Sequence, residues 1–344
     1  MKKFSYVMCI CAALISISCN KKSDARTNGD NPGGTSIAVF IPGSVSGSAT
    51  YEMLVNGVQK AAAEFSAANV SVVEAGYNQA EWESKLTALA AVKKYDVIIS
   101  SNPSLPSITE AVLQKFPNQR FILLDAELSG NRNVYTLRYN QREQSYMAGF
   151  LAALLCEESG YNTQGKAPKI GLLSAQEYPV MMNTILPGYT EGAKAVLQDI
   201  TVDFRVIGNW FDAAKAADIA GSMIGDGAKT ILAIAGGANS GVLKSAEDAN
   251  AYVIWFDTNG YSFKPGVVAG SAVLYQDKAA YNKTKLFLEG GLPFGTAEYA
   301  GVLEGYVDFI EDDPDYIKTV SDQVRKKQSA MIQKIKKGEL ILEQ

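Results

Sequence analysis

The chain has 344 residues, a formal charge of −4 and no histidine. With 47% apolar residues it can bury one large core or two moderate ones. Its charges are scattered and its basic runs are short, so nucleic acid is not an expected partner. The missing histidine removes the commonest general base and metal ligand, so the sequence predicts no catalytic residue, catalytic cofactor or metal site.

Residues 1–18 are predicted to be an export signal peptide. They carry two lysines near the start, continue with an apolar run too short for a comfortable membrane span, and end in small residues before Cys19. Cys19 is the predicted lipidated first residue of a bacterial lipoprotein, and an ordinary secretory signal cut nearby is the alternative. Residues 19–35 are rich in Gly, Asn and Asp, which is typical of a flexible tether. The folded body is therefore expected in the cell envelope, in the periplasm or at the surface, held to a membrane by lipid.

From residue 36 onward, short β-rich runs alternate with amphipathic helical stretches. Leu54, Val58, Ala61 and Phe65, for example, share one face of a predicted helix. The alternation predicts parallel sheets with helices on both faces. The expected strands cover 36–43, 70–76, 95–102, 119–125, 133–140, 169–175, 201–208, 229–236, 252–257, 266–274 and 301–310. The expected helices cover 50–65, 81–94, 107–116, 142–155 and 277–291 and lie within 315–340.

Two such series predict an α/β protein with two parallel sheets, and two sheets imply two lobes. The first lobe is expected to comprise 36–138 with parts of 262–344. The second is expected to comprise 139–261 with parts of 300–344. The late elements would complete the first lobe and cross between the two.

A ligand site is expected where the strands end, because open α/β sheets bind ligands beyond the carboxyl ends of their strands. The residues there combine aromatic faces with hydroxyl, amide and carboxyl groups, which suits a neutral ring system that carries hydroxyl groups. Asp257, which closes the apolar run 252–257, would accept hydrogen bonds from two hydroxyls at once. The predicted ligand-binding residues are Ser48, Thr50, Tyr51, Asp125, Tyr178, Trp210, Phe211, Gly237, Asn239, Trp255, Asp257 and Asn259.

Each of these residues also has a purely structural interpretation. An aspartate at a strand end is often a turn or helix-cap residue, because its side chain competes well for local backbone N–H groups. Trp255 lies two residues before Asp257, on the same side of the strand, and equally suits core packing. Gly237 can shape a tight turn, and its surroundings lack the spacing of a phosphate-binding glycine fingerprint.

Several motifs, in order, resemble the basic membrane protein family of lipoproteins: "SGSATYEMLVNGVQKA", "QREQSYMAGFLAALL", "GNWFDAAKAADIA", "ILAIAGGANSGVLKSAED" and "VIWFDTNG". The resemblance spans most of residues 36–290. It implies a type I periplasmic-binding fold, in which two Rossmann-like lobes with parallel sheets enclose a ligand cleft between them. The resemblance also implies that the chain serves as the substrate-binding component of an ABC importer, acting as a monomer with a permease and an ATPase. Purine nucleoside receptors and spirochaetal riboflavin-binding lipoproteins are members of this family.

By this resemblance, Trp210 occupies the place of a base-stacking phenylalanine, Asp257 that of an aspartate that holds ribose hydroxyls, and Asp125 that of another family acid. Leu274 replaces a lysine that grips ribose in the nucleoside receptors. A wider aromatic wall and one remaining carboxylate favour riboflavin as the transported ligand, with a purine nucleoside as the alternative. Two other classes remain open: a nucleoside-cleaving enzyme that uses Asp257 and Asp212, and a surface adhesin.

Overall fold

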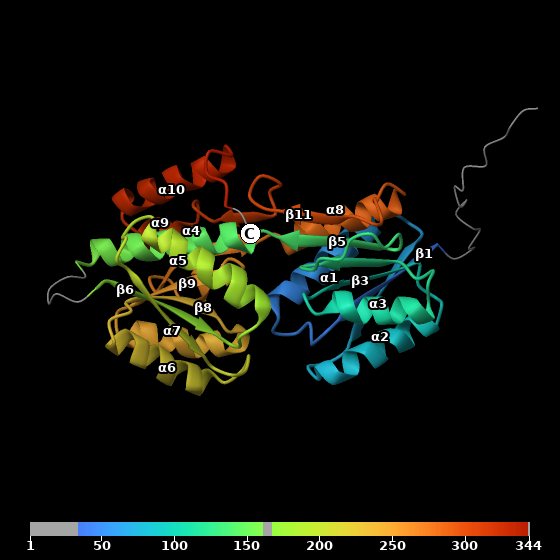
Figure 1. Cartoon of the computed structure of the whole chain (residues 1–344), viewed down its shortest axis with the longest axis horizontal. Helices are drawn as coiled ribbons and strands as arrows, with labels where there is room; N and C mark the ends of the chain where they lie inside the picture. Colours follow the sequence, from blue (N-terminus) through green and yellow to red (C-terminus); the bar gives the residue numbers. More distant parts are fainter. Residues whose placement is uncertain (1–33, 161–166, 343–344) are drawn as a thin grey trace, which may run out of the picture. The chain divides into compact units, whose positions relative to one another are not determined.

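The computed structural model describes residues 34–160 and 167–342, and within these ranges two six-stranded sheets form the framework (Figure 1). The first sheet has the order β11-β5-β4-β3-β1-β2, with all neighbours parallel. Its strands are β1 (Thr35–Ile41), β2 (Ala68–Glu74), β3 (Val97–Ser101), β4 (Phe121–Leu124), β5 (Val134–Tyr139) and β11 (Ala297–Ala300).

The second sheet repeats this plan in the order β12-β10-β9-β8-β6-β7, and only its edge strand β12 runs antiparallel among the strands described. The predicted α/β fold with two lobes built on parallel sheets is therefore confirmed. Its strands are β6 (Lys169–Ser174), β7 (Thr201–Val206), β8 (Thr230–Ile234), β9 (Tyr252–Asp257), β10 (Val268–Leu274) and β12 (Val307–Phe309).

Helices pack on both sheets because each buries one apolar face. On α1, Leu54, Val58 and Ala61 are fully buried. Between α4 and α5 the backbones touch: a Cβ added to Gly149 would lie 1.9 Å from the Tyr189 carbonyl oxygen. The helices are α1 (Ala49–Ala63), α2 (Trp82–Ala91), α3 (Leu105–Lys115), α4 (Gln141–Glu158), α5 (Leu186–Lys194), α6 (Ala213–Gly225), α7 (Asn239–Asp248), α8 (Gln276–Leu288), α9 (Pro314–Thr319) and α10 (Asp322–Lys336), with the short turns η1 (Gln79–Glu81), η2 (Met181–Ile185, a π-helical turn), η3 (Gly236–Ala238) and η4 (Tyr261–Phe263).

In the described chain, three connections link the two sheets: β5 to α4 through Asn140, β10 to α8 through Tyr275, and β11 to β12 through 301–306. All three leave the sheets at the edge formed by β5 and β11 in one lobe and by β10 and β12 in the other. The hinge between the lobes therefore lies along this edge. The strands β2 and β7 lie at the opposite edge, where the cleft between the lobes opens.

Two expectations about the late elements differ from the structure. Strand β10 pairs with β9, so residues 262–275 belong to the second lobe and not to the first. The strand expected over 301–310 is instead a turn followed by the short β12, because Glu304 and Glu143 accept hydrogen bonds from the amides at the start of this segment.

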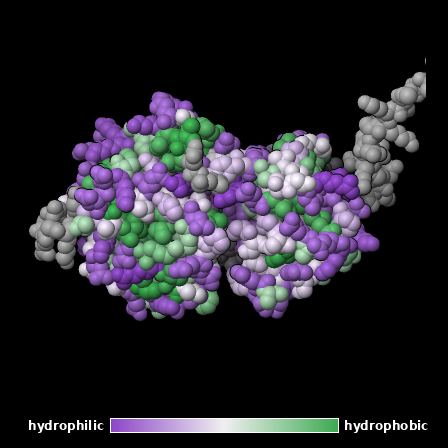
Figure 2. Space-filling model, viewed as in Figure 1, coloured by the Kyte–Doolittle hydropathy of each residue, from purple (hydrophilic) through white to green (hydrophobic). Residues whose placement is uncertain are grey.

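The predicted signal peptide 1–18, the lipidated Cys19 and most of the tether 19–35 lie outside the described residues. Within residues 34–160 and 167–342, no helix is long and apolar enough to cross a membrane. The face drawn in Figure 2 is largely hydrophilic, and its hydrophobic residues form separate patches.

Candidate functional site

The two lobes present equivalent loops to the cleft. Because the strand orders match, the loop after β1 corresponds to the loop after β6, the loop after β2 to that after β7, and the end of β4 to the end of β9. The residues on these loops match in kind as well. Tyr51 follows β1 and Tyr178 follows β6, while Asp125 follows β4 and Asp257 ends β9. The cleft is thus lined by two similar half-sites.

Asp125 and Asp257 both adopt left-handed backbone conformations, with φ of 49° and 71°. Residues other than glycine adopt this region infrequently, and such strain tends to collect at functional sites. The conformation ends each strand sharply. Both carboxyl groups are partly exposed at the ends of their strands.

The pKa values of both carboxyl groups are raised, and the charge of Asp257 acts on Asp125. Burial raises the pKa of Asp125 to about 7, the negative charge of Asp257 contributes to this rise, and Arg138 opposes the shift. Burial also raises the pKa of Asp257 to about 6, while the hydrogen bond from Gln144 opposes that shift. The pair therefore carries less than its full negative charge near neutral pH, so its carboxyl groups can both accept hydrogen bonds from a neutral ligand and donate them to it.

Gln144 on α4 positions the Asp257 carboxylate. Its Nε2 donates to Asp257 Oδ1 at 3.1 Å and to the Ala272 carbonyl at 3.0 Å. Asp257 thus bonds to the neighbouring helix α4, and its direct contact with a ligand stays a prediction. In the part of the chain that the structure describes, Gln144 Oε1 and the hydroxyl of Tyr139 are buried without a hydrogen-bond partner. Such groups carry a desolvation cost that a polar ligand would remove.

Two tyrosines frame the acidic pair. Tyr51 donates to the Pro42 carbonyl at 3.2 Å and accepts from Asn102 Nδ2 at 3.4 Å. Burial raises the pKa of Tyr51 to about 12, and Asp125 contributes to this shift. Burial likewise raises the pKa of Tyr178 well above its usual value, with further contributions from Asp257 and Asp125. Both phenols therefore stay protonated and can donate hydrogen bonds.

Trp210 and Phe211 lie on the loop after β7, with exposed fractions of 40% and 79%. The Trp210 ring lies 6.3 Å from that of Tyr178, tilted by 40°. Asn209 Oδ1 holds the loop by accepting from the amides of Phe211 and Asp212, at 3.0 and 2.7 Å. The Asp212 carboxylate accepts from the Lys215 amide and caps α6, which is a structural role.

A cavity of about 390 Å³ extends from Asp125 toward the hinge and is lined by both lobes. Arg138 Nη1 and Glu127 Oε2 form an ion pair of 2.6 Å on its wall. This charged pair gives the cavity a strongly polar wall, and Asp125 is the predicted ligand-binding residue that lines it. The cavity is lined by Pro103, Pro106, Ser107, Asp125, Ala126, Glu127, Arg138, Gln141, Pro179, Val180, Asn183 and Thr184.

Four other predicted side chains have structural partners. Asn239 is buried and bonds to the backbone of its own turn at Ala235, while Asn259 donates to Asp313 Oδ2 at 3.0 Å. Ser48 and Thr50 pair through their hydroxyls at 3.3 Å. Direct ligand contact by these residues stays a prediction.

The two remaining predicted residues, Trp255 and Gly237, also have packing roles. The Trp255 indole donates to Thr258 Oγ1 at 3.0 Å, and its partly buried ring lies 4.8 Å from that of Phe263, which is 55% exposed. Gly237 adjoins the Trp210 backbone, because an added Cβ would lie 3.4 Å from the Trp210 carbonyl oxygen.

Sequence reasoning missed several residues near the cleft: Tyr77, Asn102, Arg138, Tyr139 and Gln144. The available signal for Gln144 was its position on an otherwise apolar helix face, where it is fully buried. A buried polar side chain on such a face requires a partner, and here the partner is Asp257. Within residues 34–160 and 167–342, no group of three or more His, Cys, Asp or Glu could hold a metal ion.

Solved structures similar to this chain share its fold. An ABC transporter solute-binding protein from Aeropyrum pernix K1 superposes with a TM-score of 0.79 at 21% identity, covering 90% of this chain and 93% of that one. A solute-binding protein from Agrobacterium vitis, bound with α-D-tagatopyranose, superposes with a TM-score of 0.64 at 16% identity, covering 83% and 99%. The fold is therefore that of the two-lobed solute-binding proteins of ABC transporters.

The family model described as "ABC transporter substrate-binding protein PnrA-like" matches residues 34–340. The chain belongs to this Bmp family, which confirms the resemblance inferred from the motifs. The nucleoside-binding protein BmpA of Lactococcus lactis is 31% identical over 157 residues, covering 46% of this chain and 42% of that protein. Basic membrane protein D of Borreliella burgdorferi is 28% identical over 181 residues, covering 52% and 50%. The chain thus aligns with about half the length of each of these two relatives.

Proposed function

We propose that this chain captures a flat, neutral heterocycle that carries hydroxyl groups and delivers it to the permease and ATPase of an ABC importer. The observation that carries the proposal is the pair Asp125 and Asp257, which lie in left-handed backbone conformations at the ends of the equivalent strands β4 and β9, one in each lobe. The charge of Asp257 contributes to the raised pKa of Asp125, after the larger effect of burial. Tyr178 and Trp210 supply aromatic surface next to this pair. A ligand that bonds to both acids bridges the lobes and stabilises the closed form, which the transporter recognises.

Riboflavin is the ligand we favour, and a purine nucleoside is the second candidate. Trp210 offers a wider stacking surface than a phenylalanine would, and its neighbour Phe211 is largely exposed. The Leu274 side chain is apolar and only 4% exposed, so it offers the ligand neither a charge nor a hydrogen-bond donor. These features suit a tricyclic ring with a polyol tail. The nucleoside candidate is supported by the similarity to the nucleoside-binding protein of Lactococcus lactis.

Titration of the purified protein separates these candidates. We expect riboflavin fluorescence to be quenched at micromolar protein, and calorimetry with guanosine and inosine tests the alternative. Binding of nucleosides without flavin quenching would make the chain a nucleoside receptor, and binding of neither class would refute the proposal. Recovery of the unchanged ligand after long incubation would argue against a nucleoside-cleaving enzyme.

The role of Asp257 is tested by Asp257→Ala. We expect the affinity to fall at least tenfold, which corresponds to about 1.4 kcal/mol, because the variant removes the acceptor of the ligand hydroxyls. Asp218→Ala, at an exposed position on α6, serves as the control and should bind as the wild type does. An unchanged affinity of Asp257→Ala would limit Asp257 to a backbone role.

We also propose that Cys19 carries the lipid that holds this protein to the cell envelope. A relative from Borreliella burgdorferi is named a basic membrane protein, which supports an envelope location. Expression in a bacterial host should place the wild type in the membrane fraction and Cys19→Ser in the soluble envelope fraction. Equal partition of both proteins would contradict the anchor.

A further inference from the structure

Tyr77 is a large aromatic side chain with 72% of its surface exposed, and no role has yet been assigned to it. It lies on the loop between β2 and α2, just beyond the carboxyl end of the edge strand β2. The equivalent loop of the second lobe follows β7 and carries Trp210 and the similarly exposed Phe211. Both loops are at the sheet edge farthest from the connections between the lobes.

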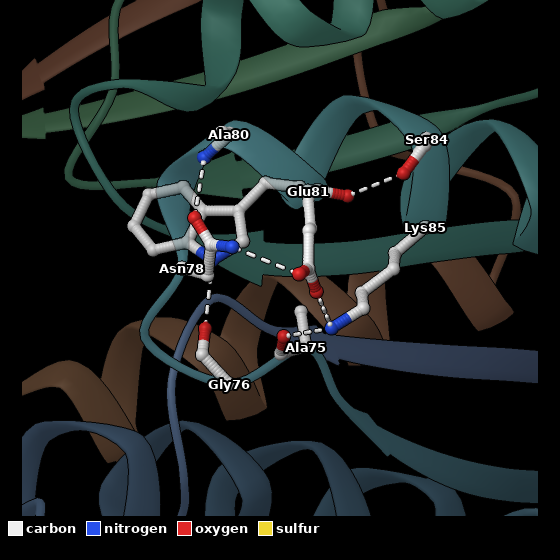
Figure 3. Close-up of polar contacts among 8 residues, drawn as sticks. Ala75, Gly76, Asn78, Ala80, Glu81, Ser84 and Lys85 are labelled. Atoms are coloured by element: carbon white, nitrogen blue, oxygen red, sulfur yellow. Dashed lines mark hydrogen bonds and ion pairs between the residues drawn. The ribbon is translucent and has the colours of Figure 1, made fainter.

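The loop that carries Tyr77 is held on both sides by side-chain hydrogen bonds (Figure 3). Before Tyr77, the Trp82 indole donates to the Gly76 carbonyl and Lys85 Nζ donates to the Ala75 carbonyl, both at 2.7 Å. After it, Asn78 Nδ2 donates to Glu81 at 2.8 Å, and the same carboxylate pairs with Lys85 at 2.6 Å.

This bracing fixes the backbone on which Tyr77 sits. Trp82 is only 4% exposed, so its donor group is anchored in the core of the first lobe. An exposed aromatic on a preorganised loop loses little conformational freedom on binding, which favours affinity.

Tyr77 also lies beside Tyr51 in the first lobe. A Cβ added to Gly43 would lie 3.1 Å from the Tyr51 ring and 3.4 Å from the Tyr77 ring, so both rings border the same glycine. The Gly76 amide donates to the Gly43 carbonyl at 2.9 Å and joins the two loops. Tyr77 contributes to the raised pKa of Tyr51, as does Asp125, so the three side chains share one electrostatic environment.

The position of the hinge determines what closure does to this residue. Rotation about the connections at β5 and β10 moves the loops after β2 and β7 through the largest arc. These loops approach each other as the cleft closes. We propose that Tyr77 is the ring-binding residue of the first lobe, and that it closes on the flat face of the bound heterocycle opposite Trp210. This proposal rests on the proposed function and names a specificity residue for the same site.

Variants at position 77 test the proposal with riboflavin as the probe. Tyr77→Ala should raise the Kd about tenfold, equivalent to about 1.4 kcal/mol. Tyr77→Phe keeps the ring and should stay within about twofold of the wild type. Tyr95→Ala, which removes an aromatic side chain at the amino end of β3 in the same lobe, is the matched control and should leave the Kd unchanged. Equal affinities of the wild type and Tyr77→Ala would overturn the proposal and leave the proposed function intact.

A second measurement does not depend on the identity of the ligand. The double variant Tyr77→Cys with Phe211→Cys is treated with a short bifunctional thiol reagent, and intramolecular cross-linking is measured. If closure brings the loops together, cross-linking should exceed that of the control pair Tyr95→Cys with Phe211→Cys, and an added ligand should increase it. If no heterocycle binds the wild type, the proposed function is refuted. If the Tyr77→Cys, Phe211→Cys variant forms no more cross-link than the control pair, the proposal that Tyr77 approaches the second lobe is refuted.

Discussion

Replacing Asp125 with asparagine should change how stability depends on pH. Burial and the neighbouring Asp257 raise the pKa of Asp125 from 3.8 to about 7. Between about pH 4 and pH 7 the folded protein therefore binds more protons than the unfolded chain, and the free energy of unfolding falls as the pH rises. A pKa rise of this size corresponds to a ceiling of about 4 kcal/mol. Water in the cleft screens a partly exposed carboxyl group, so we expect about 2 kcal/mol.

The introduced asparagine side chain would be neutral throughout this range and tolerates the left-handed backbone as well as aspartate does. Asp125→Asn should thus match the wild type near pH 4 and exceed its stability by about 2 kcal/mol near pH 8. Urea denaturation across this range measures the difference, with Asp218→Asn on the exposed face of α6 as the control. Parallel pH profiles of the wild type and Asp125→Asn would refute the electrostatic coupling inferred for the cleft.

Two further variants test neighbouring parts of the site. Gly260→Ala should lower the free energy of unfolding by about 2 kcal/mol, because its Cβ would lie 2.2 Å from the Trp255 ring; Gly225→Ala, with no atom within 4 Å, should be close to neutral. A neutral Gly260→Ala would show that the indole can move aside. Gln144→Leu removes the hydrogen bond to Asp257 and should weaken ligand binding about tenfold in a titration. Unchanged binding would mean that Asp257 keeps its orientation without Gln144.

Much of the fold could be predicted because many of its strands contain short runs of buried apolar residues. Strand β3, for example, is buried at every position, as parallel strands between two helical layers require. The short strand β11 could not be predicted in this way. It includes the charged residue Glu298, whose Oε2 lies 2.7 Å from Nζ of Lys283 on the preceding helix α8. That ion pair is evident only in three dimensions.

The candidate site shows the same limit. Position at a strand end was enough to single out Asp125 and Asp257, because the topology of parallel sheets brings such ends to one edge. Side-chain direction was not accessible from sequence. Trp255 turns toward Phe263, and Gln144 reaches Asp257 from a helix far away in the chain. The exposed position of Tyr77 depends on a network of hydrogen bonds that no short motif encodes.

Because the chain passes three times between the sheets, the order of synthesis determines when each sheet can be completed. The first sheet is not complete until β11 has been synthesised, although its other strands all precede residue 140. During synthesis, β5 therefore keeps an unpaired edge while five of the six strands of the second sheet, β6 to β10, are made. The second lobe interrupts the first, and neither lobe can be produced intact by cutting the gene at a single point. The interval before β11 arrives is the stage at which a nascent chain is most prone to aggregate.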